Sequence, residues 1–153
     1  FVDYPSEATE LSMVFAYQGQ APTCHPHMTP KLISQLQRLA DKVFVHPELI
    51  QYIISLARYT RHHQGTKLGI SPRACLTLTK LCKAKALMEG RSYVGPADIQ
   101  SLLSPAWSHR IHLNDEWIYD GVTQAYLIQE CLDKVSYHGP REAQHLIAPS
   151  SIR

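Results

Sequence analysis

Four prolines give the strongest constraint on the fold of this chain, because each begins a segment in which apolar residues recur at helical spacing. They occur in the pairs Thr29-Pro30, His46-Pro47, Ser71-Pro72 and Gly95-Pro96. Proline is favoured at the first position of a helix, where its missing N–H needs no partner and its φ angle is already helical. No segment alternates cleanly between apolar and polar residues, as a half-buried strand would. The sequence therefore predicts an all-α fold.

The apolar spacing predicts a small helical bundle of about five to six helices with short connections. We expect a helix capped by Ser6, helices at 30–43, 47–61 and 72–88, a short helix at 96–103, and a last helix from about Gly121 to Lys134. Pro105 is expected to interrupt the short helix, since an interior proline removes a backbone hydrogen bond. Each amphipathic helix needs an apolar partner, so these helices are expected to pack against one another.

Breaker-rich segments divide the chain into four parts. Residues 1–17 are expected to form a hinge and the first helix, and residues 18–28 a loop. Residues 29–135 are expected to form the main helical domain, followed by a C-terminal tail at 136–153. The chain does not begin with Met, and its start is typical of the middle of a longer protein.

The composition is that of a globular protein with one compact domain or two very small ones. Of the 153 residues, 44% are hydrophobic and 18% are charged, which is enough apolar material for a core. A net charge of +2 is too balanced for a nucleic-acid-binding surface, which needs clustered Lys and Arg. No apolar run approaches the roughly 20 residues that span a bilayer, and no signal peptide is visible. We expect a cytoplasmic protein with neither nucleic acid nor membrane as a partner.

The cysteines support the same location. Cys75 and Cys82 fall on one expected helix, about 10 Å apart along its axis, which is too far for a disulfide. Other pairings stay open, but nothing in the spacing suggests a disulfide framework. The cysteines are therefore interpreted as reduced, small, buried hydrophobic residues.

No segment carries the residues of a familiar catalytic centre. The nearest approach to a phosphate loop, Gly65-Thr66-Lys67-Leu68, lacks the second glycine and the hydroxyl residue after the lysine. Asp115-Glu116 is expected in a solvated loop rather than at a magnesium site. Cys24, His25 and His27 form a C-H-x-H cluster that is too tight for the usual zinc spacing, so no metal is expected there.

The helix expected at 72–88 begins with an arginine, where carboxylates are usually favoured. Ser71 is a good N-cap and Pro72 suits the first position, so Arg73 stands in the first turn. A cation there is unfavourable by roughly 0.3–1 kcal/mol, because the N-terminus of a helix carries partial positive charge. Two explanations stay open. Arg73 could face solvent or pair with a distant carboxylate, or it could meet an anion, most naturally a phosphate, at the free N–H groups of the helix start.

The motifs around this arginine resemble the C-terminal lid of the MoxR family of AAA+ ATPases, which reads roughly G-A-S-P-R-A, A-x-A, G-R-x-Y-V-x-P-x-D-V and H-R-I. The matching segments are Leu68-Gly69-Ile70-Ser71-Pro72-Arg73-Ala74, Ala84-Lys85-Ala86, Gly90-Arg91-Ser92-Tyr93-Val94-Gly95-Pro96-Ala97-Asp98-Ile99, His109-Arg110-Ile111, and upstream Tyr4-Pro5-Ser6 and Thr60-Arg61. The resemblance covers most of the chain from Tyr4 to about Lys134. Ile70 replaces the usual Ala, Gly95 a usual Thr or Ser, and Trp107-Ser108 a usual Leu-Arg, but none of these departures touches Arg73.

The resemblance implies a lid that couples ATP binding and hydrolysis to conformational change in a chaperone-like machine. Arg73 would be its sensor 2 residue and reach the terminal phosphate, with Ser71 and Pro72 beginning its helix. ATP and Mg²⁺ would bind to the full-length protein, but no tight binding and no catalysis are expected from this fragment, since the phosphate loop and the acidic magnesium motif would precede Phe1. The implied partners are its own N-terminal ATPase core, further copies in a ring hexamer, and proteins with von Willebrand A domains.

Two other functions stay open beside this resemblance. The chain could be an unrelated all-α protein-interaction or DNA-binding module that uses Lys80, Lys83 and Lys85, although these lysines are expected to form a solvated helix face. An independent metal enzyme would depend on the Cys-His cluster alone.

The remaining polar motif residues are expected to have structural roles. Arg91 and Tyr93 would fix the bend after Gly90, and Asp98 suits the start of the following helix. Arg61 could pair with a carboxylate or contact the nucleotide, and His62-His63 is expected to be an exposed helix end. His109-Arg110 could bond either to the interior of the lid or to a neighbouring subunit.

Overall fold

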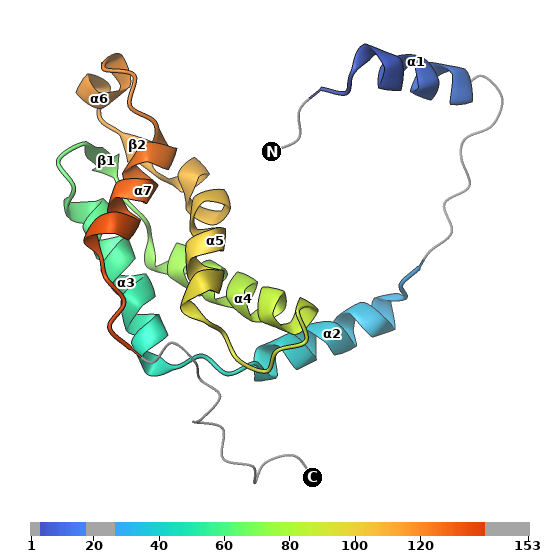
Figure 1. Ribbon diagram of the computed structural model, residues 1–153, viewed down its shortest axis with the longest axis horizontal. Coiled ribbons are helices and arrows are strands. Elements are labelled where there is room, and N and C mark those ends of the chain that lie inside the picture. Colours follow the sequence, from blue (N-terminus) through green and yellow to red (C-terminus); the bar gives the residue numbers. More distant parts are fainter. Residues whose placement is uncertain (1–3, 18–26, 140–153) are drawn as a thin grey trace, which may run out of the picture. The chain divides into compact units, whose positions relative to one another are not determined.

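The computed structural model describes residues 4–17 and 27–139 (Figure 1). The chain divides into two compact units, Phe1–Ile33 and Ser34–Arg153. In the first unit, α1 (Glu7–Ala16) begins directly after Ser6, as predicted, and buries none of its side chains. The helix α2 (Pro30–Lys42) begins in the first unit and ends in the second.

The second unit is built of helices, as the sequence predicted. It contains α3 (Pro47–His62), α4 (Pro72–Met88), α5 (Pro96–Trp107), the 3-10 turn η1 (Ser108–Arg110), α6 (Asp115–Tyr119) and α7 (Gln124–Lys134). A very small antiparallel sheet pairs β1 (Thr66–Leu68) with β2 (His112–Leu113). The all-α class is confirmed, and the described residues contain seven α-helices where about five to six were expected.

Proline begins the helices at all four predicted places. Pro30 is the first residue of α2, and Pro47, Pro72 and Pro96 stand in the first turn of α3, α4 and α5. Side chains cap three of these starts. Thr29 Oγ1 accepts a hydrogen bond from the N–H of Leu32 (3.2 Å), His46 Nδ1 accepts one from the N–H of Glu48 (3.2 Å), and Ser71 Oγ accepts one from the N–H of Ala74 (3.3 Å).

The structure differs from the sequence prediction in the last third of the helical region. Pro105 does not interrupt α5, which continues to Trp107; the proline lies near the helix end, where it removes one backbone hydrogen bond while the buried Trp107 holds the last turn in place. The segment at Asp115-Glu116 is the short helix α6 rather than a loop, because Asn114 caps it by accepting a hydrogen bond from the N–H of Trp117 (3.0 Å).

The core of the second unit lies where α3, α4, α5 and α7 meet. Figure 1 shows α5 beside α4 and α7 beside α3, and these pairs are in contact. Leu56, Leu78, Leu103 and Leu127, one from each helix, are completely buried. Burying such a side chain fully contributes about 1.5–3 kcal/mol, so this apolar centre is the main source of stability.

The core also fixes the start of α4. Trp107, buried at the end of α5, donates a hydrogen bond from Nε1 to the carbonyl oxygen of Ala74 in the first turn of α4 (3.4 Å). Ile70, which precedes that turn, is completely buried. No helix in the described part of the chain is long and apolar enough to cross a membrane.

Candidate functional site

The candidate site is the beginning of α4, where the structure places all three predicted site residues. Ser71 is the N-cap, Pro72 is the first helical residue, and Arg73 follows with an exposed side chain. The N–H of Ala74 donates a hydrogen bond to Ser71. Pro72 has no backbone N–H, and the N–H of Arg73 has no acceptor among the described residues. The first turn therefore presents one free N–H together with a guanidinium.

No described residue neutralises Arg73. Over residues 4–17 and 27–139, its guanidinium makes no hydrogen bond and no ion pair. The distant carboxylate partner that the sequence left open is therefore not found in this part of the chain. The first turn of α4 also contains no acidic residue. The positive end of the helix and the charge of the arginine reinforce each other, which is the electrostatic requirement for binding an anion.

The segment before α4 is held against the end of α3. The N–H of Ile70 donates a hydrogen bond to Thr60 Oγ1 (3.1 Å), and Arg61 Nε donates one to the carbonyl oxygen of Ile70 (2.6 Å). Thr60 is completely buried, and its hydroxyl donates in turn to the carbonyl oxygen of Ala57 (2.8 Å). Arg61 thus bonds to a backbone carbonyl, and the carboxylate partner expected from the sequence is absent from the described residues.

A groove of about 380 Å³ runs beside the start of α4. Its lining is mostly apolar and comes from α3 and α4: Ile50, Ile53, Ile54, Arg61, Pro72, Cys75, Leu76 and Thr79. Burial raises the pKa of Cys75, whereas the positive charge of Arg61 acts to lower it, so the arginine acts electrostatically on this groove.

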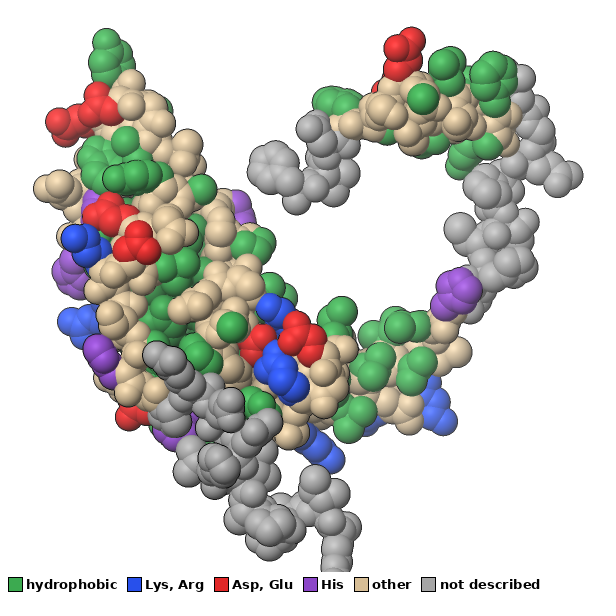
Figure 2. Space-filling view, viewed as in Figure 1, with side chains coloured by type: hydrophobic (Ala, Val, Ile, Leu, Met, Phe, Trp, Pro, Cys, Tyr) green, Lys and Arg blue, Asp and Glu red, His purple; other side chains and the backbone are tan. Residues whose placement is uncertain are grey.

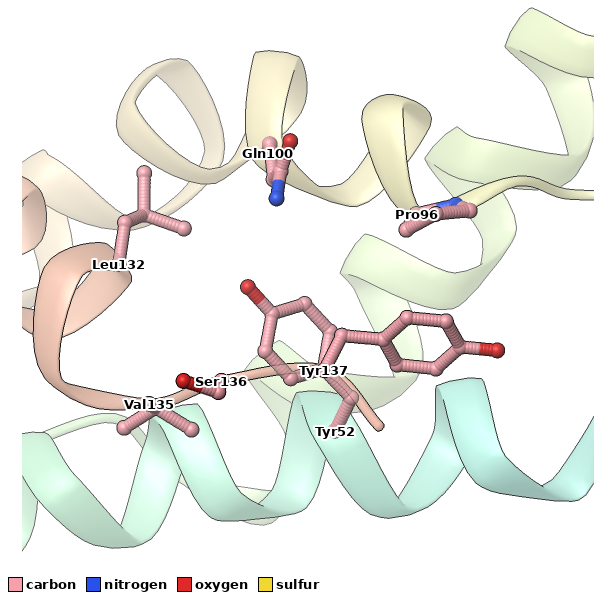
Figure 3. Close-up of a pocket in the computed structure, with 7 residues that line it drawn as sticks. All are labelled: Tyr52, Pro96, Gln100, Leu132, Val135, Ser136 and Tyr137. Atoms are coloured by element: carbon pink, nitrogen blue, oxygen red, sulfur yellow. The ribbon is translucent and has the colours of Figure 1, made fainter. Parts of the chain in front are cut away.

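A second hollow, of about 430 Å³, lies between α3, α5 and the segment after α7. Figure 3 shows the rings of Tyr52 and Tyr137 side by side in its centre, with Gln100 reaching toward them from α5. The two ring centroids are 5.5 Å apart. None of its seven lining residues is charged, and it shares none of them with the groove beside α4, so it does not suit a phosphate.

The Gly-Arg-x-Tyr-Val motif has a structural role at the turn between α4 and α5. Arg91 donates from Nη1 to Asp98 Oδ2 (2.9 Å) and from Nη2 to Asp98 Oδ1 (2.7 Å), and also bonds to Glu89 and to the carbonyl oxygen of Tyr93. Asp98 Oδ2 also accepts a hydrogen bond from the N–H of Gly95 (2.8 Å) at the start of α5. Figure 2 shows acidic and basic side chains gathered over this turn.

The hydrogen bonds between Arg91, Asp98 and Gly95 account for the bend that the sequence predicted after Gly90. Asp98 is buried, and burial acts to raise the pKa of its carboxyl, but the hydrogen bonds from Arg91 and Gly95 and the nearby charges lower the pKa overall. The carboxylate is therefore ionised and held by its partners. The ring of Tyr93 is only half-buried and lies 5.8 Å from Cζ of Arg91.

The lysines proposed for a DNA-binding surface do not form a free basic face. Lys83 Nζ donates to the carbonyl oxygen of Asp41 (2.8 Å). Lys85 Nζ bonds to Ser101 and lies 3.7 Å from the carboxylate of Asp98. Of the three, Lys80 alone makes no hydrogen bond and no ion pair within the described chain, and one lysine does not make a nucleic-acid surface.

The histidines are divided between the surface and the interior. His62 is exposed, as expected, but the side chain of His63 is only 9% exposed, because its ring packs edge-on against Trp117 with centroids 4.8 Å apart. His109 accepts a hydrogen bond at Nε2 from Arg110 Nε (3.1 Å) on η1. This local bond joins the two residues to each other and not to the interior of the unit, and contact with a neighbouring subunit stays a prediction.

The described residues contain no group of three or more His, Cys, Asp or Glu side chains that could hold a metal ion. His27 is exposed, while Cys24 and His25 lie outside the described residues. Cys75, Cys82 and Cys131 are free thiols; Cys82 and Cys131 are buried, as predicted, whereas Cys75 is only half-buried.

Comparison with known proteins identifies the helical unit that carries Arg73. The family described as AAA lid domain matches residues 58–131, from the end of α3 to α7. The chain contains an AAA lid domain. The matched region includes Arg73 and the contacts that hold the start of α4, so the candidate site belongs to the lid itself.

The relatives of this lid confirm the resemblance to the MoxR family. The protein YeaC of Bacillus subtilis is 31% identical over 142 residues, covering 92% of this chain and 44% of YeaC. Chaperone MoxR1 of Mycobacterium tuberculosis is 26% identical over 144 residues, covering 88% of this chain and 38% of MoxR1. The crystal structure of a proposed ATPase from Cytophaga hutchinsonii matches with a TM-score of 0.80 at 25% identity, covering 90% of this chain and 45% of that one.

The chain spans less than half the length of each of these relatives. The AAA lid is thus one part of the proteins that it resembles. What the whole protein binds and does has to be argued from the site on this part.

Proposed function

We propose that this chain is the sensor 2 lid of a MoxR-like AAA+ ATPase and that Arg73 binds the terminal phosphate of ATP in the full-length protein. One observation carries the proposal: an exposed guanidinium stands in the first turn of α4 with no acidic partner among the described residues. The position agrees with the Ser-Pro-Arg motif of the MoxR lid, and the AAA lid family and the MoxR relatives support it.

A bound phosphate would offset the unfavourable electrostatic energy of Arg73 at the positive end of α4. Without an anion, a cation in the first turn costs roughly 0.3–1 kcal/mol. With a phosphate present, the guanidinium can donate two parallel hydrogen bonds to its oxygens, and the free N–H and the helix dipole act in the same direction. The site therefore favours the nucleotide state that has a phosphate at this position, and the lid can respond to hydrolysis.

The remaining parts of the machine belong to the same proposal. The lid would act on its own N-terminal ATPase core, which would supply the phosphate loop and the ligands for Mg²⁺. When Mg²⁺ is bound, it neutralises part of the negative charge of the phosphates. We further propose that the full-length protein forms a chaperone-like ring, as a hexamer, and acts on partners with von Willebrand A domains. Movement of the lid about the segment near Tyr4-Pro5 would transmit the nucleotide state.

The direct test is to remove the guanidinium from the full-length protein. Arg73→Ala is expected to lower ATP turnover at saturating ATP by roughly 100-fold, the usual effect of losing one donor to a developing negative charge. Thermal stability should not fall, because the Arg73 side chain makes no hydrogen bond or ion pair within the described chain and its removal takes an unfavourable cation out of the first turn. Arg73→Lys should recover only part of the activity, since an ammonium cannot donate in the same planar fork.

The matched control is Arg58→Ala, which removes an equally exposed arginine from the surface of α3. It should leave turnover within about twofold of wild type, because a single surface charge away from the reacting groups has little effect. Wild-type turnover in Arg73→Ala would remove this residue from the site and with it the proposed function.

A further inference from the structure

We propose that Thr60 and Arg61 are positioning residues for Arg73, so that the end of α3 sets the direction in which the sensor arginine points. The inference rests on the proposed function, because it concerns how the same site is held in place. It adds two residues that do not touch the nucleotide themselves.

The first observation is that both polar backbone groups of Ile70 are bonded to these two consecutive residues. Thr60 Oγ1 accepts from its N–H at 3.1 Å, and Arg61 Nε donates to its carbonyl oxygen at 2.6 Å. A peptide segment held at both its donor and its acceptor cannot rotate about its own axis without losing a bond. The backbone that leads into Ser71 therefore has a fixed orientation relative to α3.

The second observation is that Gly69 lies directly against the backbone of α3. A Cβ atom at this position would lie 2.7 Å from both the Cα and the N of Arg61, and 2.8 Å from the carbonyl carbon of Thr60. Such distances are too short for any side chain, so the glycine permits the close approach on which the two hydrogen bonds depend.

These contacts determine the position of Arg73 through a very short connection. Only Ser71 and Pro72 separate Ile70 from Arg73, and both are constrained, the first as the cap of α4 and the second by its ring. A change in the orientation of Ile70 would therefore also displace the guanidinium of Arg73. A misplacement of about 1 Å in a group that contacts the reacting atoms can lower a rate by roughly 100-fold.

Arg61 gives the sharper test, because it is exposed whereas Thr60 is completely buried. In Arg61→Gln, the amide nitrogen is separated from Cα by the same number of bonds as Nε of arginine, so this variant can keep the hydrogen bond to Ile70. Arg61→Met has a chain of the same length and no donor. Both variants remove one positive charge, so a difference between them reports the hydrogen bond and not the charge.

The experiment measures kcat and the KM for ATP of the full-length protein for both variants, alone and combined with Arg73→Ala. We expect kcat of Arg61→Met to be about tenfold below that of Arg61→Gln. We expect the two to be equal when Arg73 is replaced by Ala, because a residue that acts through Arg73 has no effect in its absence. Where turnover of the combined variants is too slow to measure, the affinity for ATP is compared instead.

Several outcomes would overturn the inference. Equal kcat values for Arg61→Met and Arg61→Gln in the presence of Arg73 would show that the hydrogen bond to Ile70 does not matter. If kcat of Arg61→Met and Arg61→Gln differed by the same factor with and without Arg73, the hydrogen bond would have a general structural effect and would not act through Arg73. In either case a strong loss in Arg73→Ala alone would leave the proposed function intact, whereas wild-type activity of Arg73→Ala would overturn both.

Thr60 supplies an independent check on the same backbone group. Thr60→Ser keeps the hydroxyl that accepts from Ile70, and Thr60→Val removes it at nearly constant shape. We expect kcat near wild type for the serine variant and a loss of about tenfold for the valine variant, measured at a temperature where both are folded. Equal activity of the two would contradict a positioning role for Thr60.

Discussion

Removing Arg91 is predicted to destabilise the second unit strongly, because it leaves a buried carboxylate without its main partner. The side chain of Asp98 is 4% exposed and accepts two hydrogen bonds from Arg91. Removing one partner of a buried ion pair typically costs about 3–5 kcal/mol. The N–H of Gly95 and the ammonium group of Lys85, 3.7 Å away, still remain near Asp98. We therefore expect Arg91→Met to lower the free energy of unfolding by about 3 kcal/mol, at the lower end of this range.

The loss can be measured by urea unfolding of the purified chain at pH 7, followed by circular dichroism. The midpoint should fall with little change in slope, and the melting temperature should fall by roughly 10 °C or more. Lys85→Met is the control, since Lys85 lies 3.7 Å from the carboxylate of Asp98 where Arg91 lies 2.7 Å from it, and its removal should cost less than about 1 kcal/mol. Combining Arg91→Met with Asp98→Asn should cost less than the sum of the two, because no buried charge is left unpaired. A loss below about 1 kcal/mol for Arg91→Met would refute the argument.

Three further predictions concern Gly69, the carboxylate of Asp98 and the activity of the chain alone. Gly69→Ala should destabilise the chain by about 1–3 kcal/mol in urea unfolding, because its Cβ would lie 2.7 Å from the backbone of Arg61; an unchanged midpoint would contradict this close approach. Burial acts to raise the pKa of Asp98, but Arg91 and Gly95 lower it overall, so its contribution to stability is present above the unfolded pKa of about 3.9 and is lost as the pH falls through the lower folded value. The cost of Asp98→Asn should accordingly shrink below about pH 4, and a constant cost from pH 7 to pH 3 would show that the pKa is not lowered. The purified chain alone should show no appreciable ATP hydrolysis in a phosphate-release assay, whereas clear turnover would mean that it carries a catalytic centre of its own.

The starts of the helices could be predicted from the sequence, because the signals that set them are local. Pro30, Pro47, Pro72 and Pro96 each mark a helix start in the structure, and the cap at Ser71 was predicted as well. The place of Arg73 in the first turn of α4 followed from the same local signals. The candidate site could therefore be placed on its helix before the structure was known.

The contacts that hold the site could not be predicted, because they join residues separated in sequence or depend on burial. The bonds from Thr60 and Arg61 to Ile70 span about ten residues and require the turn that brings β1 back along α3. The packing of His63 against Trp117 likewise depends on how α6 lies against the residue that follows α3. The Thr-Arg and Leu-Gly motifs on either side of β1 were the available signal, but spacing alone does not say that they meet.

The central claim is that Arg73 contacts the terminal phosphate, and the affinities of the full-length protein for a non-hydrolysable ATP analogue and for ADP test it most directly. ADP lacks that phosphate, so Arg73→Ala should weaken binding of the ATP analogue by roughly tenfold or more and change binding of ADP much less. Equal weakening of both nucleotides, or no weakening of either, would contradict the claim.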